Sequence, residues 1–310
     1  MKALKTRRRF LGTGLAGLAS LGLTPGCTGL LPTTARGTSA RHLEVARVET
    51  VTVKLPYRDA PNRAMSRELP HWRYVEIFRV FLKSGEVGIG ETLLYYTWGV
   101  STDDHIKRVL GKNAAEHMWD DGLGAGLQIA LFDAVAKTLE VPIHRLLGRK
   151  VHERTPLSWW NIDVAADDMA SECREALRKG YLSYKTKGRP WFDIWKQVDT
   201  AARAVPEAFK IDMDFNDTLL TAERGMKIIK DLEKYPQIDI YETPIPQGDV
   251  AGNAQIRARI DRPVAMHYGQ PPILTTLTED VADGFMVCAG ASAVVKQAAV
   301  ADAANKPFWL

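Results

Sequence analysis

The second half of the chain alternates short apolar runs with stretches of helical periodicity, and this alternation limits the possible folds most strongly. After Pro156, each apolar run is short enough to be a strand and is followed by a segment long enough to be a helix. Repeated strand and helix units predict a parallel sheet whose strands are connected by helices. We expect strands at residues 157–162, 182–186, 209–215, 238–242, 263–267, 285–288 and 307–310.

Polar residues lie at the ends of four of these runs. Lys187, Asp214, Glu242 and His267 follow one another at intervals of about 25 to 28 residues, and a (β/α)8 barrel uses about 30 residues for each unit. In such a barrel the carboxyl ends of the strands meet at one mouth, so these four side chains should converge there. An open doubly wound sheet is the alternative fold, but no glycine-rich phosphate loop follows any predicted strand.

The region before the barrel has a different pattern, which predicts a small antiparallel sheet and then helices. Alternation of apolar and polar residues indicates strands, and the segment Lys-Ser-Gly-Glu between two of the runs indicates a hairpin turn. We expect strands at 45–55 and 74–82 and helices at 103–110 and 127–139. The domains predicted are a signal segment at 1–27, a linker at 28–42, an α+β capping domain at 43–150 and a partial β/α barrel at 151–310.

The N-terminus has the features of an export signal. Thr-Arg-Arg-Arg-Phe-Leu at residues 6–11 precedes an uncharged apolar run, a pattern typical of a twin-arginine signal. We therefore expect a periplasmic or other extracytoplasmic location. Leu-Thr-Pro-Gly before Cys27 resembles a lipoprotein cleavage box, so lipid attachment at Cys27 is an alternative to simple cleavage. That anchor is the only membrane association predicted.

Charge excludes one class of partner. The formal net charge is +4, but the basic residues of the signal segment account for this excess, so the remaining body is close to neutral. A body without a basic run has no electrostatic footprint for nucleic acid. We expect a small carboxylate substrate instead, and a homo-oligomer is possible because an unclosed barrel would leave strand edges to pair.

The residue types at the predicted mouth favour proton abstraction. Lys185 and Lys187 alternate along a strand and point to the same side. Neighbouring like charges disfavour protonation, so each lysine is expected to depress the pKa of the other. We assign the role of general base to Lys187, and expect Lys185 to tune it and to help hold the substrate carboxylate.

Oxygen ligands follow on the next two strands. Asp214 and Glu242 are hard donors suited to Mg²⁺, which would stabilise the charge that develops on a carboxylate as its α-proton leaves. Asn216 follows Asp214 by two residues, so the strand alternation places it on the same side, where it could bind a substrate hydroxyl. Taken singly, such residues are as often solvated lysines, helix caps, surface ion pairs or structural histidines, and only their joint spacing favours a site.

The motifs, in this order, resemble those of the mandelate racemase and muconate-lactonising family of the enolase superfamily. Tyr-Lys-Thr-Lys-Gly at 184–188 is similar to the Lys-x-Lys strand of that family. Asp-Phe-Asn at 214–216 resembles its Asp-x-Asn ligand strand, and Tyr-Glu-Thr-Pro at 241–244 its Glu-Glu-Pro ligand strand. The segment 126–148 is similar to the helix that joins the capping domain of that family to its barrel.

The resemblance implies a (β/α)8-type barrel with an N-terminal capping domain, and a lysine base that works beside Mg²⁺. This chain departs from the family pattern at three places. Where the family has an acidic third metal ligand, the chain has His267, which suits Mn²⁺ or Zn²⁺ better than Mg²⁺. The predicted strand at 285–288 carries neither the lysine nor the aspartate of the family, and no eighth strand is visible after 307–310, so we expect a barrel that is incomplete at its C-terminus.

We therefore expect a metal-dependent lyase or isomerase that abstracts the α-proton of a hydroxy acid or sugar acid, as a dehydratase or racemase does. The alternative is a non-catalytic exported barrel, either a binder of acidic sugars or an inactive truncated remnant. By resemblance, the specificity loop over the mouth is predicted at 56–70.

Overall fold

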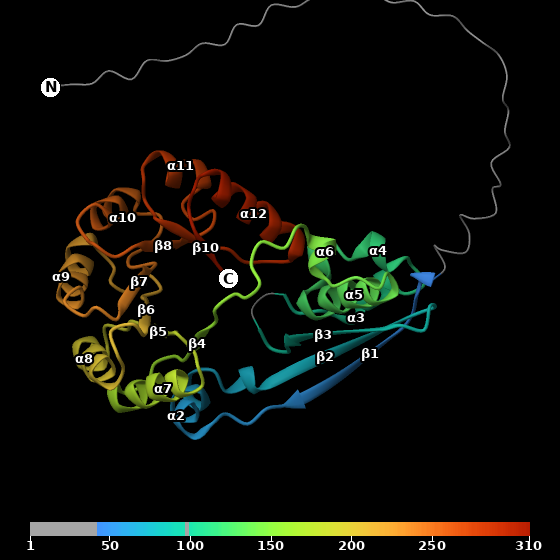
Figure 1. Ribbon diagram of the computed structural model, residues 1–310, viewed down its shortest axis with the longest axis horizontal. Helices are drawn as coiled ribbons and strands as arrows, with labels where there is room; N and C mark the ends of the chain where they lie inside the picture. Colours follow the sequence, from blue (N-terminus) through green and yellow to red (C-terminus); the bar gives the residue numbers. More distant parts are fainter. Residues whose placement is uncertain (1–41, 97–98) are drawn as a thin grey trace, which may run out of the picture.

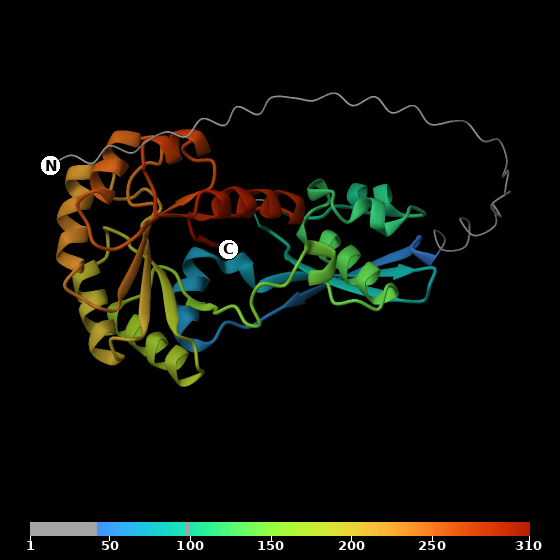
Figure 2. The same ribbon diagram turned by 45° about the horizontal axis from the view of Figure 1, so that its top comes forward.

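The protein is described here from a computed structural model, which covers residues 42–96 and 99–310. It contains a three-stranded antiparallel sheet in the order β1-β2-β3 and a seven-stranded parallel sheet in the order β10-β9-β8-β7-β6-β5-β4. The second sheet curls, and helices cover its outer side (Figure 1), as the turned view also shows (Figure 2). This confirms the predicted fold class, an incomplete (β/α)8-type barrel with an N-terminal α+β capping domain.

The predicted export signal, Cys27 and most of the linker lie outside the described residues, so these assignments stay predictions. Among the helices that are described, none is both long enough and apolar enough to cross a membrane.

The capping domain is built on a meander of three strands, β1 (Val45–Lys54), β2 (Tyr74–Leu82) and β3 (Val87–Leu93). Its long helix α5 (Ala125–Thr138) packs closely on this sheet at Gly88 and Gly90. A Cβ at either position would collide with α5, so the close packing requires glycine there. The remaining elements are α2 (Asp59–Glu68), η1 (Pro70–Arg73), α3 (Asp103–Val109), α4 (Ala114–His117), η2 (Asp121–Leu123) and α6 (His144–Leu147).

The barrel domain has all seven predicted strands, shortened at most of their ends. They are β4 (Ser158–Trp160), β5 (Ser183–Lys187), β6 (Lys210–Asp214), β7 (Ile238–Glu242), β8 (Val264–His267), β9 (Gly284–Met286) and β10 (Phe308–Trp309). The helices between them are α7 (Ala166–Arg178), α8 (Ile194–Ala204), α9 (Ala222–Leu232), α10 (Val250–Arg257), α11 (Ile273–Thr278) and α12 (Ala291–Ala303). Each strand runs parallel to its neighbour, as the alternation of strands and helices predicts.

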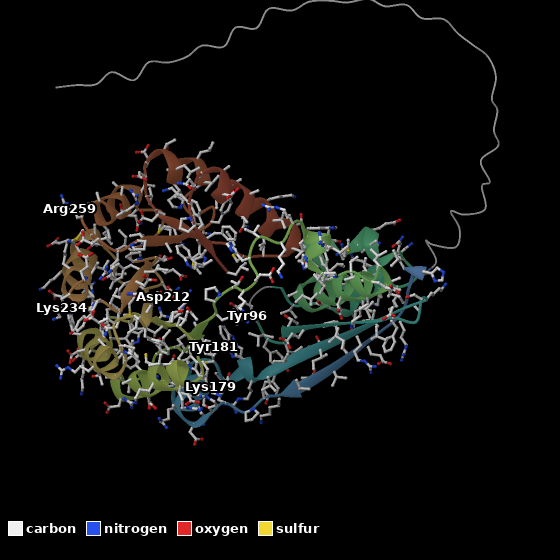
Figure 3. All side chains as sticks on the ribbon, viewed as in Figure 1. Tyr96, Lys179, Tyr181, Asp212, Lys234 and Arg259 are labelled. Atoms are coloured by element: carbon white, nitrogen blue, oxygen red, sulfur yellow. The ribbon has the colours of Figure 1, made fainter. Side chains whose placement is uncertain are left out.

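Alternation along the strands separates the hydrophobic core from the polar interior of the curl. Tyr184 on β5, Met213 on β6 and Tyr241 on β7 are completely buried and belong to the main core cluster, together with residues of the covering helices. Asp212 lies inside the curl, whereas Lys234 and Arg259 lie on the outer, helix-covered side (Figure 3). The curled sheet therefore directs its polar side chains towards its open inner side.

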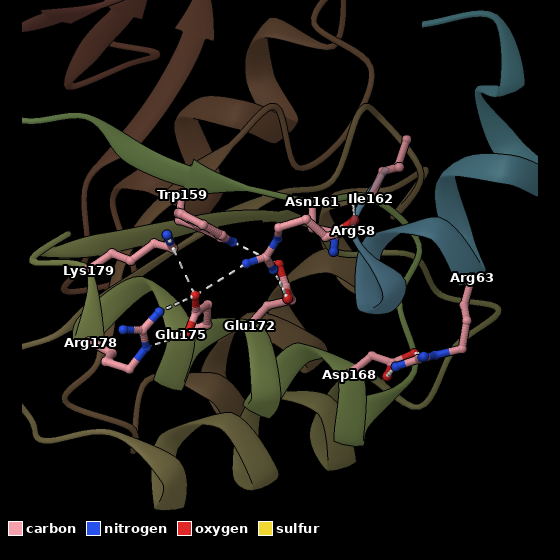
Figure 4. Close-up of polar contacts among 10 residues, drawn as sticks. All are labelled: Arg58, Arg63, Trp159, Asn161, Ile162, Asp168, Glu172, Glu175, Arg178 and Lys179. Atoms are coloured by element: carbon pink, nitrogen blue, oxygen red, sulfur yellow. Dashed lines mark hydrogen bonds and ion pairs between the residues drawn. The ribbon is translucent and has the colours of Figure 1, made fainter. Parts of the chain in front are cut away.

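The segment predicted as a specificity loop at 56–70 is mostly helix, and it docks on the barrel. Figure 4 shows Arg58, at the start of α2, beside the buried carboxylate of Glu172 on α7, and Arg63 beside Asp168 on the same helix. Glu172 also accepts a hydrogen bond from Trp159 Nε1 at 2.9 Å. The prediction of a loop was wrong because these stabilising partners are distant in the sequence.

Removal of the Glu172 carboxylate tests this docking. Glu172 is only 2% exposed, so Glu172→Ala should leave Arg58 and the Trp159 indole without their partner and lower the free energy of unfolding by about 1–3 kcal/mol. Trypsin should then cleave α2 faster, at Arg63 or Arg67. Asp167→Ala on the same helix is the matched control, because this exposed carboxylate in the first helical turn contributes at most about 1 kcal/mol. Equal effects of the two substitutions would contradict the assignment of Glu172 as the anchor.

A second contact joins the capping domain to the barrel at the N-terminus of α12. The Asp121 carboxylate accepts hydrogen bonds from the backbone N–H groups of Ser292 at 2.9 Å and Ala293 at 2.8 Å. Gln128 accepts from the Ala291 N–H at 2.9 Å and donates to Asp121 at 3.0 Å. The capping domain thus supplies the helix cap that Gly290, which has no side chain, cannot provide.

This cap should depend on pH. Burial opposes ionisation of Asp121, but the hydrogen bonds from Gln128 and the α12 backbone outweigh it and lower the pKa of the carboxyl. Asp121→Ala should therefore lower the free energy of unfolding by about 1–2 kcal/mol at neutral pH. The difference from wild type should shrink as the pH falls below 3.8, the usual pKa, because the wild-type carboxylate then takes up a proton. Urea unfolding at several pH values measures this, with Asp302→Ala on α12 as the control; a difference that does not change with pH would contradict it.

Candidate functional site

Three neighbouring strands bring the predicted site residues together at the carboxyl edge of the parallel sheet. Lys187 ends β5, Asp214 ends β6 and Glu242 ends β7. The strand register pairs Lys187 with Asp214, and Asp214 with Glu242. Lys185 lies two residues before Lys187 and points to the same side, as strand alternation predicts.

The two lysines and two carboxylates are in direct contact. Lys187 Nζ donates a hydrogen bond to Asp214 Oδ2, and Lys185 Nζ donates one to Glu242 Oε2. Lys185 Nζ also lies 3.6 Å from Asp214 Oδ2, so it bridges the two carboxylates. The Asp214 side chain is 1% exposed and the Glu242 side chain 5%. The predicted convergence of Lys185, Lys187, Asp214 and Glu242 is therefore present as one ion-paired group.

The two carboxylates differ in how readily they ionise. Burial opposes the ionised form of Asp214, but Lys187 and Lys185 outweigh it and lower the Asp214 pKa. Burial, together with the negative charge of Asp214, raises the pKa of Glu242 to about 7. Asp214 is therefore the firmly ionised member of the pair. Glu242 therefore takes up a proton more readily than an ordinary carboxyl group does, although Lys185 donates a hydrogen bond to it.

The electrostatics of Lys185 differ from the prediction. We expected repulsion between the lysines to depress its pKa, but in the structure its pKa is raised. Burial works in the predicted direction, whereas Glu242 and Asp214 act against it and prevail. The two carboxylates come from the next strands, so the neighbouring lysine in the sequence gives no sign of their effect.

Asn216 does not occupy the position that alternation predicts. Strand β6 ends at Asp214, and Asn216 has a left-handed backbone with φ of 44°. Its backbone N–H donates a hydrogen bond to Asp214 Oδ1 at 3.0 Å. The structure thus shows Asn216 orienting the Asp214 carboxylate through its backbone, and the prediction that its side chain binds a hydroxyl stays untested.

His267 ends β8, the next strand of the sheet, and its Nε2 lies 3.5 Å from Glu242 Oε1. Burial lowers the His267 pKa, with Lys185 and Lys187 acting in the same direction and Asp214 opposing. The imidazole is therefore neutral at neutral pH, the form in which histidine binds a metal. The Gln247 side chain accepts a hydrogen bond from the His267 backbone N–H at 3.0 Å and holds the strand end in place.

Two of the side chains at this site, Asp214 and Glu242, are suitable ligands for a divalent cation, but a third protein ligand is not in place in the part of the chain that is described. Asp214 and Glu242 are adjacent, buried oxygen donors, the type of ligand that a hard cation prefers. Within residues 42–96 and 99–310, however, no three His, Cys, Asp or Glu side chains are arranged to hold a metal ion together. His267 is close to Glu242 without completing a three-ligand set.

Two features of the site were missed from the sequence. Asp212 lies two residues before Asp214 on β6 and pairs in register with Lys185; burial raises its pKa to about 6, and its Oδ1 has no hydrogen-bond partner. The alternation that placed the two lysines together would have found it. Arg189 Nε, in the loop after β5, donates to Asp163 Oδ1 at 3.1 Å in the loop after β4. No local pattern joins those two loops.

Several known proteins resemble this chain in sequence and in architecture. The sequence model of the family described as "Enolase C-terminal domain-like" matches residues 168–310. The N-succinyl-L-Arg/Lys racemase of Bacillus cereus is 27% identical over 146 residues, which are 47% of this chain and 39% of that protein. The L-Ala-D/L-Glu epimerase of Bacillus subtilis is 25% identical over 247 residues, 72% of this chain and 66% of that protein. The chain therefore spans less than two thirds of each of these relatives.

Solved structures show the same fold. A substrate-liganded complex of the Bacillus subtilis epimerase superposes with a TM-score of 0.65 at 21% identity, covering 86% of this chain and 81% of that one. An enolase from Bradyrhizobium, complexed with magnesium and mandelic acid, superposes with a TM-score of 0.66 at 20% identity and the same coverage. Residues 168–310 therefore belong to the enolase C-terminal domain-like family, and the chain resembles racemases and epimerases of the mandelate racemase and muconate-lactonising group of the enolase superfamily.

Proposed function

We propose that this protein is a divalent-metal-dependent enzyme that removes the α-proton of a hydroxy acid or sugar acid, with racemisation or dehydration as the outcome. One observation carries the proposal: Lys187 and Lys185 contact Asp214 and Glu242 at the ends of three adjacent strands. This arrangement places a potential base beside two hard oxygen ligands. The racemase and epimerase relatives support isomerase chemistry.

The proposed role of each lysine follows from its contacts. Lys187, in its neutral form, would take the α-proton at Nζ, while the electron pair of the broken C–H bond moves into the carboxylate of the substrate. Lys185 would remain charged, as its raised pKa favours, and would bind that carboxylate as negative charge develops. Return of the proton from Lys187 to the same face would restore the substrate, so inversion needs a proton donor on the opposite face.

The proposed metal ligands are Asp214 and Glu242, with His267 as the third candidate. A divalent cation held by these residues would supply positive charge beside the substrate carboxylate. Mg²⁺ suits the two oxygen donors, and participation of His267 would shift the preference towards Mn²⁺ or Zn²⁺.

The second candidate function is a non-catalytic barrel that binds acidic sugars or is an inactive remnant. The incomplete three-ligand set among the described residues favours it. Metal affinity separates the two candidates, because the proposed chemistry needs a bound cation at Asp214 and Glu242 whereas a binder does not.

Exchange of the α-proton tests the proposal directly. In D₂O, the purified protein with Mg²⁺, Mn²⁺ or Zn²⁺ should replace the α-proton of at least one member of a panel of 2-hydroxy acids and sugar acids, measured by NMR. Chelation of the metal should stop the exchange, and addition of the metal should restore it. Exchange that continues at the same rate after chelation would contradict the metal requirement. Absence of both exchange and metal binding in well-folded protein would favour the non-catalytic alternative.

A further inference from the structure

A cavity of about 370 Å³ opens beside the ion-paired group, at the same edge of the sheet. Its walls come from the loops that follow β6, β7 and β8, the strands that end in Asp214, Glu242 and His267. Because the carboxyl ends of neighbouring parallel strands meet at one edge, this cavity borders the site where the substrate carboxylate is proposed to bind. The Gln247 side chain lines the cavity and also binds the His267 backbone, so the two regions share a wall.

The lining of the cavity has one sign of charge. Among the residues that the structure describes, Asp217 is the only charged one in this lining, and the others are glutamines, prolines and glycines. Within the described part of the chain, the Asp217 carboxylate forms no ion pair and no side-chain hydrogen bond, and its Oδ1 is buried without a partner. The backbone holds it in place, since the Asp217 N–H donates to the Thr243 carbonyl at 2.9 Å. A fixed, unpaired carboxylate in a hollow favours a cationic ligand.

The rest of the lining suits a chain that carries such a cation. Pro246, Pro271 and Pro272 present apolar surfaces. Gln247 Nε2 donates a hydrogen bond to Gln270 Oε1 at 3.2 Å. This bond engages an amide N–H group that could otherwise bind an anion. A methylene chain can pack on the prolines while a terminal ammonium group reaches Asp217.

We infer that this cavity is a substrate subsite, which takes a positively charged ammonium group at the end of a substrate whose carboxylate lies at Lys185 and Lys187. The inference rests on the proposed function, because the carboxylate end is placed there. It narrows the substrate to hydroxy acids with a distal primary amine.

Paired ligands test this subsite on the full chain. Each probe is an ω-amino-2-hydroxy acid, in a series of increasing chain length, paired with the 2-hydroxy acid of the same carbon chain without the amine. Calorimetry should show that at least one ω-amino-2-hydroxy acid of the series binds at least about tenfold more tightly than the matching 2-hydroxy acid without the amine. Asp217→Asn should abolish this preference, and Asp302→Asn, an exposed carboxylate on α12, should retain it.

A second variant covers the case in which Asp217→Asn does not fold. Gly248 lines the cavity, and a side chain there would enter open space, so Gly248→Leu should fill the hollow and weaken binding of the same amino acids. Equal affinities within every pair, or a preference that survives Asp217→Asn or Gly248→Leu, would overturn the inference. Alpha-proton exchange is followed in parallel: a preference for the amine without exchange would contradict the proposed function and leave the subsite standing.

Discussion

Substitution of Lys187 by alanine is expected to lower the rate of α-proton exchange by about a thousandfold, since general base catalysis contributes about 10²- to 10⁴-fold. The side chain is the one whose Nζ is held on Asp214 at the end of β5. Without it, Lys185 is a poor replacement as the base, because its raised pKa keeps it protonated. NMR exchange in D₂O, with saturating metal and substrate, measures the loss.

Two controls separate loss of the base from general damage to the site. Metal binding by Lys187→Ala should persist, because Asp214 and Glu242 are unchanged. Lys227→Ala, which removes an exposed lysine on α9, should retain full exchange. An exchange rate in Lys187→Ala close to that of wild type would exclude Lys187 as the base and point to Lys185 or Asp212 instead.

The parts of the site that the sequence predicts are those that depend on strand geometry. Lys185 and Lys187 share a face because side chains alternate along a strand, and the intervals to Asp214 and Glu242 match one β/α unit each. Both properties are local or periodic, so they can be read without knowledge of distant contacts. The register between strands then completes the site, with Lys187 beside Asp214 and Asp214 beside Glu242.

The parts that the sequence does not predict depend on contacts between distant segments. Asn216 does not follow the strand alternation, because β6 ends at Asp214. Beyond that residue, the backbone N–H groups of Phe215 and Asp217 donate to carbonyls at the end of β7 and in the loop after it. Helix α2 was expected as a loop, since its partners Asp168 and Glu172 lie about a hundred residues further along the chain. Tertiary contacts of this kind override local patterns.

The charge state of the site is a further property that the sequence alone does not predict. Two lysines in sequence suggest mutual repulsion, but the raised pKa of Lys185 and the Glu242 pKa of about 7 result from four groups on three strands. The sequence identifies the groups, whereas their balance of burial and charge depends on distances that only the fold sets.

Asp214 is expected to show the largest combined effect of any substitution in this protein, because it contacts both lysines and is the central proposed metal ligand. Asp214→Ala should bind Mg²⁺ or Mn²⁺ at least about a hundredfold more weakly, because loss of an outer-shell partner alone costs about 10- to 100-fold. In metal-free protein the same change removes the carboxylate that Lys187 contacts; within residues 42–96 and 99–310 this lysine pairs with no other carboxylate, and its side chain is 14% exposed. We expect the free energy of unfolding to fall by about 3–5 kcal/mol.

The variant Asp214→Asn separates these two effects. It keeps the shape of the side chain and can still accept a hydrogen bond from Lys187, so it should lose less stability than Asp214→Ala while losing most of the metal affinity. Calorimetry for the metal and urea unfolding of chelated protein measure the two quantities independently. If both variants kept wild-type metal affinity, the cation could not lie at Asp214. If Asp214→Ala were as stable as wild type, the contacts of Lys185 and Lys187 with this carboxylate would contribute nothing to the fold, and the ion-paired group would exist only to serve the reaction.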